Sequence, residues 1–153
     1  MAVVREADRA DTMGVLTLIQ EFSDAAAADH LWVDQEKAVD LVESLLEAED
    51  AVIFVADDDG ESVGFIVGFL GEILFNKVKY STELAWFVRP EHRGGTVALR
   101  LLKAYEEWGK SKGVHIINMA DMSILQDHGG LYEKLGYSKV ETCYVKKTEN
   151  AQW

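Results

Sequence analysis

The most informative residues for chemistry lie at positions 87–98 and read Phe-Val-Arg-Pro-Glu-His-Arg-Gly-Gly-Thr-Val-Ala. An apolar strand pattern stops at Pro90, and a loop with two adjacent glycines, Gly94 and Gly95, leads directly into a helical pattern. Glycines allow backbone amides to approach a ligand closely. The first turn of a helix has four amides without partners and a partial positive charge. This combination can bind a pyrophosphate group.

The residue types exclude two familiar phosphate-binding patterns at this loop. No Gly-Lys-Ser or Gly-Lys-Thr follows the glycines, as it would in a Walker loop, and the order Gly-x-Gly-x-x-Gly of a dinucleotide turn is missing. Glycines that precede a helix also often form a turn that binds nothing. The spacing alone therefore leaves anion binding and a structural turn both open.

The histidines and the single cysteine do not form a recognisable reactive group. His30, His92, His115 and His128 lack the paired spacing of metal ligands, and Cys143 adds none, so we predict no metal site. Of the four histidines, His115 lies within an apolar strand pattern and is interpreted as structural. Cys143 is interpreted as inert, because nucleophilic catalysis needs an activating base that the sequence does not place beside it.

Composition and charge limit the classes of partner. The chain has 153 residues, 48% of them hydrophobic, and a net charge of −12 from 15 basic and 27 acidic side chains. This length favours a single domain, residues 1–153. The acidic balance disfavours nucleic acid and anionic membranes, and a cationic partner such as an amine is the easier match. The acidic residues are spread over helices and turns, which also argues against a mimic of nucleic acid.

The cellular location is expected to be the cytoplasm. The first residues do not resemble a signal peptide, because acidic side chains follow within a few positions. No apolar run approaches the roughly 20 residues of a membrane span. A lone cysteine, Cys143, cannot form an internal disulfide and fits a reducing compartment.

Hydrophobic periodicity predicts an α/β fold, with two helices before the main strands. Apolar residues recur at helical spacing after Asp11 and again after Asp34, each of which we expect to cap a helix. A hairpin signal at residues 57–60 separates two strand patterns. Strands are expected at residues 3–4, 51–56, 63–70, 83–88 and 114–119, and in one or two pieces over 137–147.

The second half has the pattern of a crossover unit. A long helix is expected after Gly95, ending near Gly113, between the strands at 83–88 and 114–119. A strand, a helix and a second strand in this order predict parallel pairing of the two strands. A short helix should end at Gly136. The elements together predict a mixed, mostly antiparallel sheet flanked by helices.

Two segments of this chain resemble motifs of one enzyme family. Residues 88–98 are similar to the strand end and coenzyme loop, Gln/Arg-x-x-Gly-x-Gly/Ala, of the GNAT superfamily of N-acetyltransferases. Residues 131–137, Leu-Tyr-Glu-Lys-Leu-Gly-Tyr, resemble the family's Leu-Tyr-x-Lys-x-Gly-Phe/Tyr segment. The separation of the two motifs and the order of the elements also resemble the family over nearly the whole chain.

This resemblance implies the acyl-CoA N-acyltransferase fold, which has a V-shaped splay between the fourth and fifth strands. It implies acetyl-CoA as a co-substrate, whose acetyl group passes directly to a primary amine of a small molecule or a protein. The pantetheine arm would pair with the strand backbone and the pyrophosphate would bind loop amides. The implied contact residues are Phe87, Val88, Arg93, Gly94, Gly95, Thr96, Val97 and Ala98.

The resemblance also implies roles in proton transfer. Glu83 lies on the strand that leads to the loop and is the candidate general base, acting directly or through water. Tyr132 is the candidate acid for the departing thiolate. Glu83 could equally be a solvated residue at a strand start, and Tyr132 a helix residue packed on the sheet. Candidate substrate-binding residues are Trp32, Asp121, Ser123 and His128.

Departures from the motifs leave a non-catalytic module that binds acetyl-CoA, or a protein-interaction module of the same fold, as the alternative. Leu125 stands where the family often has asparagine, and Thr96 stands where it has glycine. Many relatives pair through late strands, so the resemblance is compatible with a homodimer.

A β-branched residue such as Thr96 is strained wherever the backbone needs a positive φ. Its hydroxyl could instead donate to a phosphate oxygen, with Gly95 supplying the backbone freedom. We expect Thr96→Gly to retain coenzyme binding in a direct binding assay. Loss of binding in that variant would show that the hydroxyl is required.

Overall fold

The computed structural model describes residues 1–26, 28–122 and 129–153. The chain forms two compact units, Met1–Ala120 and Asp121–Trp153, and each is described by itself. The division leaves the single domain of residues 1–153 as a prediction. In the described residues, no helix has both the length and the apolar character needed to cross a membrane.

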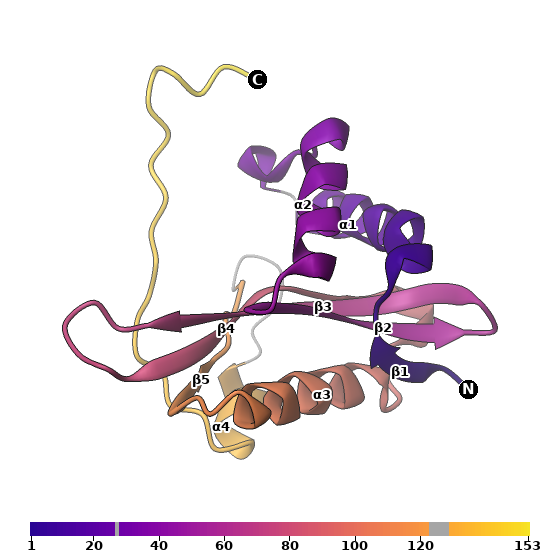
Figure 1. The fold of residues 1–153 in the computed structure, drawn as a ribbon. Coiled ribbons are helices and arrows are strands. Elements are labelled where there is room, and N and C mark those ends of the chain that lie inside the picture. Colours follow the sequence, from indigo (N-terminus) through magenta and orange to yellow (C-terminus); the bar gives the residue numbers. More distant parts are fainter. Residues whose placement is uncertain (27, 123–128) are drawn as a thin grey trace. The chain divides into compact units, whose positions relative to one another are not determined.

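A five-stranded mixed sheet forms the centre of the first unit (Figure 1). The order in space follows the order in sequence, with β1 to β4 antiparallel and β4 parallel to β5. This is the mostly antiparallel sheet predicted from the sequence. The strands are β1 (Val3–Glu6), β2 (Ala51–Asp58), β3 (Glu61–Glu72), β4 (Lys79–Val88) and β5 (Ile116–Asn118).

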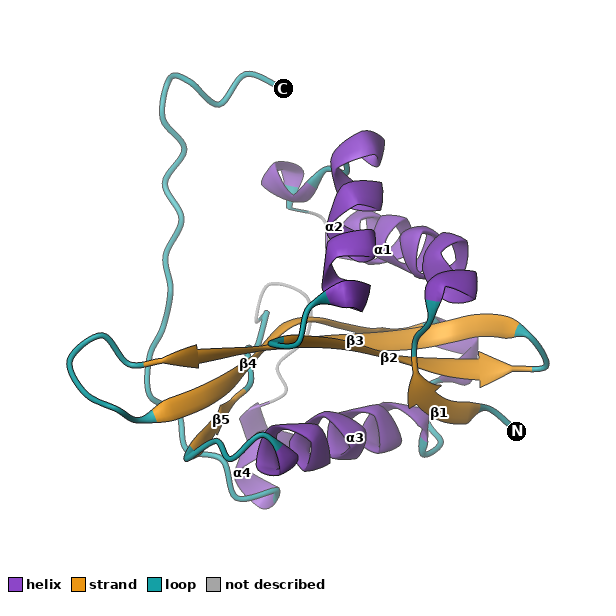
Figure 2. Ribbon diagram, in the orientation of Figure 1, coloured by secondary structure: helices purple, strands orange, loops and turns teal. Residues whose placement is uncertain are grey.

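Helices cover both faces of this sheet (Figure 2). The helices α1 (Thr12–Ala26) and α2 (Gln35–Glu47) lie on one face, and α3 (Val97–Ser111) lies on the other. The connection β4–α3–β5 is the predicted crossover between parallel strands. Because the middle parts of β2 and β3, residues 51–56 and 63–70, are buried on both faces, they are apolar and do not alternate with polar residues.

Each face has its own apolar cluster. The cluster under α1 and α2 contains Val15, Leu18, Val42, Phe65 and Phe87, among others. The cluster under α3 is formed by residues of β2, β3 and β4 together with one side of that helix. Its main members are Ala56, Val63, Ile66, Val88, Leu101, Leu102 and Tyr105. The alternation of side chains along β4 therefore directs Phe87 to one cluster and Val88 to the other.

Local signals at turns and helix ends are largely confirmed. The Asp34 side chain accepts a hydrogen bond from the Lys37 amide, 3.0 Å away, and caps α2 as predicted. Gly60 in the β2–β3 hairpin and Gly113 after α3 both have positive φ, 86° and 76°. These are the conformations that favour glycine.

The expected cap at Asp11 is wrong. Asp8 caps a short 3-10 turn, η1 (Arg9–Asp11), that precedes α1. The Asp11 carboxylate is instead buried, and it accepts hydrogen bonds from the Arg5 guanidinium and the Asp8 amide. The Arg5 guanidinium lowers the pKa of Asp11, so this ion pair joins β1 to the start of α1.

The described part of the second unit has one helix, α4 (Gly129–Lys134), and an extended tail. The helix ends before Gly136, whose φ is 91°, as predicted. The strands expected over residues 137–147 are wrong: the described residues of this segment form no strand. A strand needs a neighbour to satisfy its backbone, and the described residues of this unit include no other strand. Val140 and Tyr144 are accordingly 84% and 92% exposed.

Candidate active site

The splay between β4 and β5 is the main feature of the site. The two strands pair only from Tyr80 to Thr82, opposite residues 116–118. Among the described strands, β4 then continues to Val88 beside β3 alone. On its other edge β4 carries a bulge, because Gly68 lies opposite Glu83 and Val67 opposite Ala85. A bulge bends a strand and increases its twist. The two strands therefore part at Glu83, which confirms the predicted V shape.

Strand alternation decides which backbone groups line the splay. The Arg89 amide donates to the Val63 carbonyl of β3, 2.9 Å away. Because hydrogen-bonded pairs alternate along an antiparallel ladder, the backbone of Phe87 also faces β3, while that of Val88 faces the open edge. The Val88 carbonyl accepts from Arg93 Nε at 2.7 Å, which agrees with this assignment. Of the two residues predicted to pair with a coenzyme arm, only Val88 turns its backbone to the splay.

Arg89 holds the end of β4 in place. Its guanidinium forms ion pairs with Glu21 of α1 and with Glu61 at the start of β3. Its carbonyl accepts from the His92 amide at 2.9 Å and begins a 3-10 turn, η3 (Pro90–His92). The start of the loop is thus tied to three separate elements. No motif in the sequence singled out Arg89, because its partners are 68 and 28 residues away.

The segment 93–96, which we call the glycine turn, is open to solvent. Gly94 has a φ of 87°, and an added Cβ at Gly94 or Gly95 would meet no atom within 4 Å. Within the described residues, the amides of Gly94, Gly95 and Thr96 donate no hydrogen bond. The first amides of α3 follow immediately and have no intrahelical partners. The turn therefore presents a row of donors to a ligand.

Thr96 fits this turn without strain. Its φ is −103°, an ordinary value for a β-branched residue, so the concern raised by the missing glycine does not apply. The hydroxyl oxygen accepts from Arg100 Nε at 3.1 Å. The hydroxyl hydrogen can still donate to an anion. The departure at Thr96 thus leaves the donor character of the turn intact.

Positive charge gathers at the turn, although the chain as a whole is acidic. The Arg93 guanidinium lies over the Phe87 ring, 5.3 Å from its centroid, in a cation–π contact. Arg100 donates to the carbonyl of Ala2 at 2.7 Å, which holds its charge beside the first turn of α3. Together with the helix dipole, these side chains favour an anion at this position.

Glu83 lies where the two strands part, and it is partly buried. Its Oε2 accepts a long hydrogen bond, 3.4 Å, from the Ala120 amide just beyond β5. Burial raises the pKa of Glu83 to about 7, and the Ala120 bond opposes that rise. A carboxyl group that titrates near neutrality can accept a proton and release it again at physiological pH.

Apart from Trp32, the other candidate residues lie in the second unit or outside the described residues. Tyr132 is a buried residue of α4, and its ring lies 5.7 Å from that of Tyr137. Asp121 begins the second unit and is half-buried. Ser123, His128 and the departure at Leu125 lie outside the described residues. The structure does not place these side chains relative to Glu83, so their roles stay predictions.

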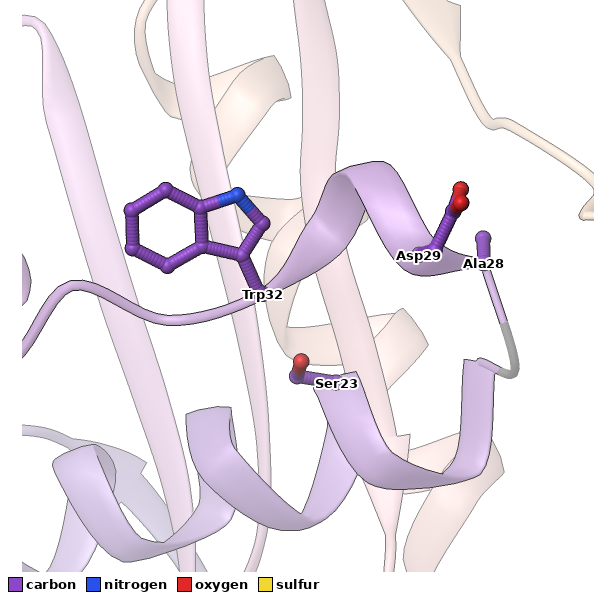
Figure 3. Close-up of a pocket in the computed structure, with 4 residues that line it drawn as sticks. All are labelled: Ser23, Ala28, Asp29 and Trp32. Carbon is purple, nitrogen blue, oxygen red and sulfur yellow. The ribbon is translucent and has the colours of Figure 1, made fainter. Parts of the chain in front are cut away.

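Trp32 lines an open pocket of about 290 Å³ with Ser23, Ala28 and Asp29. Figure 3 shows Trp32 and Asp29 projecting from the two ends of the 3-10 turn η2 (Asp29–Leu31), with Ser23 rising from α1. The Trp32 side chain is 56% exposed, so one face of the indole is available to a ligand. Sequence analysis selected Trp32 and missed the other three residues, which carry no motif.

His92 and His115 have partners within the protein. His115 Nδ1 accepts from the Lys79 amide at 2.9 Å, which supports its interpretation as structural, and His92 Nε2 lies 3.3 Å from Asp58 Oδ2. In residues 1–26, 28–122 and 129–153, no cluster of three or more His, Cys, Asp or Glu could hold a metal. Cys143 is exposed.

Comparison with known proteins identifies the family. The model of the family described as "Acetyltransferase (GNAT) family" matches residues 19–137, which include both motifs and the whole splay. The chain belongs to the acetyltransferase (GNAT) family. This confirms the resemblance drawn from the two motifs.

The individual relatives of this GNAT protein share only a low sequence identity with it. An aminoglycoside N(6')-acetyltransferase type 1 of Stenotrophomonas maltophilia is 33% identical over 87 residues, which are 54% of this chain and 57% of that protein. A transcriptional regulator from Bacillus halodurans C-125 is 17% identical with a TM-score of 0.82, over 97% of this chain and 100% of that one. AAC(6')-Iy, in complex with the bisubstrate analogue CoA-S-monomethyl-acetylneamine, is 19% identical with a TM-score of 0.76, over 97% and 99%.

The raised pKa of Glu83 predicts a pH-dependent stability. The folded protein binds this proton more tightly than the unfolded chain, so the favourable contribution is full below about pH 4.5 and is lost as pH rises through 7. Glu83→Gln cannot ionise, and we expect it to exceed the wild type in free energy of unfolding above pH 7 by up to about 3 kcal/mol. Urea unfolding between pH 5 and 8 measures the difference. The exposed Glu72→Gln is the control, and equal pH dependence of all three proteins would contradict the shift.

Proposed function

We propose that this GNAT protein is an acetyl-CoA-dependent N-acetyltransferase that moves an acetyl group directly to a primary amine. One observation carries the proposal. The glycine turn, whose amides donate no hydrogen bond to a described residue, lies just beyond the end of the strand that also holds Glu83. The candidate diphosphate site therefore follows the strand, β4, that carries the candidate proton acceptor. Family membership supports the same activity.

Acetyl-CoA fits this arrangement as a co-substrate. Its pyrophosphate would accept hydrogen bonds from the amides of residues 94–98, and the nearby arginines would offset its charge. The backbone of Val88 would pair with the pantetheine arm as an added strand would. The thioester would then lie beside β4, close to Glu83.

Glu83 would perform the proton transfer that starts the reaction. An alkyl ammonium has a pKa of about 10.4 and must lose a proton before its nitrogen can attack the thioester. The Glu83 carboxylate takes that proton, directly or through a water molecule. The free amine attacks the acetyl carbonyl, the carbon–sulfur bond breaks as the thiolate of CoA leaves, and the nitrogen loses its second proton to solvent to give the neutral amide. Tyr132 is proposed, from its motif alone, to protonate that thiolate.

The acceptor is proposed to be a cationic amine. Between Arg9 and Lys37 the chain has six acidic residues and no lysine or arginine, and the Trp32 pocket lies within this stretch. An indole face beside carboxylates attracts ammonium groups. Phe22, next to pocket residue Ser23, packs edge-on against Phe87 of β4, 6.3 Å away, which places the pocket near the strand that carries Glu83. The S. maltophilia relative's aminoglycoside is one such acceptor, and protein amines remain another.

Location and assembly are also proposals. A cytoplasmic enzyme is supported by the single cysteine, which is exposed and has no partner cysteine in the chain. A homodimer is supported only by the resemblance to a family whose members often pair through late strands.

Gly94→Ala should weaken acetyl-CoA binding at least about tenfold, because an alanine strains a backbone with φ of 87° and shifts the amides of the turn. Gly60→Ala is a matched control, since Gly60 has φ of 86° and equally open surroundings in the distant hairpin. Both variants should lose about 1 kcal/mol of stability. Isothermal titration with acetyl-CoA distinguishes them, and equal affinities would contradict the proposed site.

Glu83→Gln should lower kcat by about 10²- to 10⁴-fold at pH 7.5, because the base is removed. In the wild type, kcat/KM should rise with pH through a midpoint near 7, where Glu83 ionises, and this limb should vanish in the variant. Thiol release in a screen of polyamines, aminoglycosides and peptide amines measures the rates, with Glu72→Gln as control. Binding of acetyl-CoA without thiol release from any amine would favour the non-catalytic module instead.

A further inference from the structure

Tyr105 of α3 is a polar side chain in the apolar cluster beneath the splay, and it is fully buried. Its ring packs on Gly68 of β3, where an added Cβ would lie only 2.6 Å from Cε1. Its hydroxyl donates to the carbonyl of Asn118, 2.9 Å away, and lies against the buried Ser81 hydroxyl of β4. A phenylalanine would fill the same space, so the hydroxyl has a role other than packing.

The hydroxyl bonds β5 at the residue where its pairing ends. Asn118 is the last β5 residue in register with β4. Ala120, two residues further, donates the 3.4 Å bond to Glu83 Oε2. Tyr105 therefore bonds the chain two residues before the amide that contacts Glu83.

We propose that Tyr105 is a positioning residue for acetyl transfer, whose hydroxyl holds the end of β5 so that the Ala120 amide stays on Glu83. The inference rests on the proposed role of Glu83 as the base. Gly68 is part of the same arrangement, because only a residue without Cβ leaves room for the Tyr105 ring. Neither residue carries a family motif that would have indicated this role from the sequence.

The electrostatic surroundings are consistent with this role. Burial raises the pKa of Tyr105 well above its usual range, so the hydroxyl remains a donor at any working pH. The charges that act on Tyr105 are those of Glu83 and Glu106, both negative. Among described residues, Glu83 itself is affected by burial and by the Ala120 amide. Loss of the amide contact should therefore raise the pKa of Glu83, because the bond favours its ionised form.

The test follows the Ala120 amide by NMR between pH 5 and 9. In the wild type its chemical shift should titrate with a midpoint near 7, and this titration should disappear in Glu83→Gln. In Tyr105→Phe the midpoint should move up by about half a pH unit or more, or the amplitude should fall sharply. Tyr80→Phe, which removes another hydroxyl from the same sheet, should behave as the wild type does.

Kinetics complete the test. In Tyr105→Phe the acid limb of kcat/KM should move to higher pH with the NMR midpoint, while the affinity for acetyl-CoA stays within about twofold. Gly68→Ala displaces the Tyr105 ring by adding a Cβ beneath it, and it should shift the acid limb of kcat/KM in the same direction. This variant replaces Tyr105→Phe in the test if Tyr105→Phe does not fold.

Three results would overturn the inference. Identical Ala120 titrations in Tyr105→Phe and wild type would make Tyr105 a packing residue only. A wild-type Ala120 amide that does not titrate would remove the contact itself. A shifted NMR midpoint with an unchanged pH–rate profile would show that the contact has no catalytic consequence. Full activity in Glu83→Gln would instead refute the proposed base, whatever the NMR titrations show.

Discussion

The whole site depends on the early end of pairing between two parallel strands. β4 and β5 share only three residue pairs, and the bulge at Glu83 turns β4 away from its neighbour. A strand edge in the middle of a sheet would normally be paired, because unpaired backbone groups are costly when buried. We propose that an extended ligand pairs with part of this edge, near Val88. The same divergence places Glu83 at the vertex, where burial raises its pKa towards neutrality.

Contacts outside the site keep this arrangement rigid. Arg89 ties the end of β4 to α1 and β3, Arg93 returns to the Val88 carbonyl, and Arg100 reaches the start of the chain at Ala2. Each of these bonds satisfies a group within the protein and leaves the amides of the glycine turn unoccupied. Preorganised donors of this kind can bind an anion without first breaking bonds of their own. Three arginines thus give an acidic protein one local surface suited to a phosphate ligand.

The sequence predicted the parts that depend on local patterns. Helical spacing located α1, α2 and α3, the cap at Asp34 and the glycine at position 113 marked helix boundaries, and the two motifs pointed to the glycine turn. Contacts between segments far apart in the chain could not be predicted from the sequence. Nothing local shows that Phe87 faces β3 while Val88 faces the splay, since that depends on the register with β3. The strands expected at 137–147 have suitable residue types, yet a strand forms only where a neighbour is present. Tyr105 falls on the apolar face of α3, and helical spacing cannot indicate the role of its hydroxyl, because the bonding partner comes from β5.

The central claim is that the amides of the glycine turn bind the diphosphate of acetyl-CoA. Amide hydrogen exchange, measured with and without saturating acetyl-CoA, tests this residue by residue. We predict that the amides of Gly94, Gly95 and Thr96, which donate no hydrogen bond to a described residue, exchange rapidly in the free protein and become protected when the ligand binds. Protection should extend to the Val88 amide on the open edge of β4. Unchanged exchange at these positions, despite measurable binding, would contradict the account.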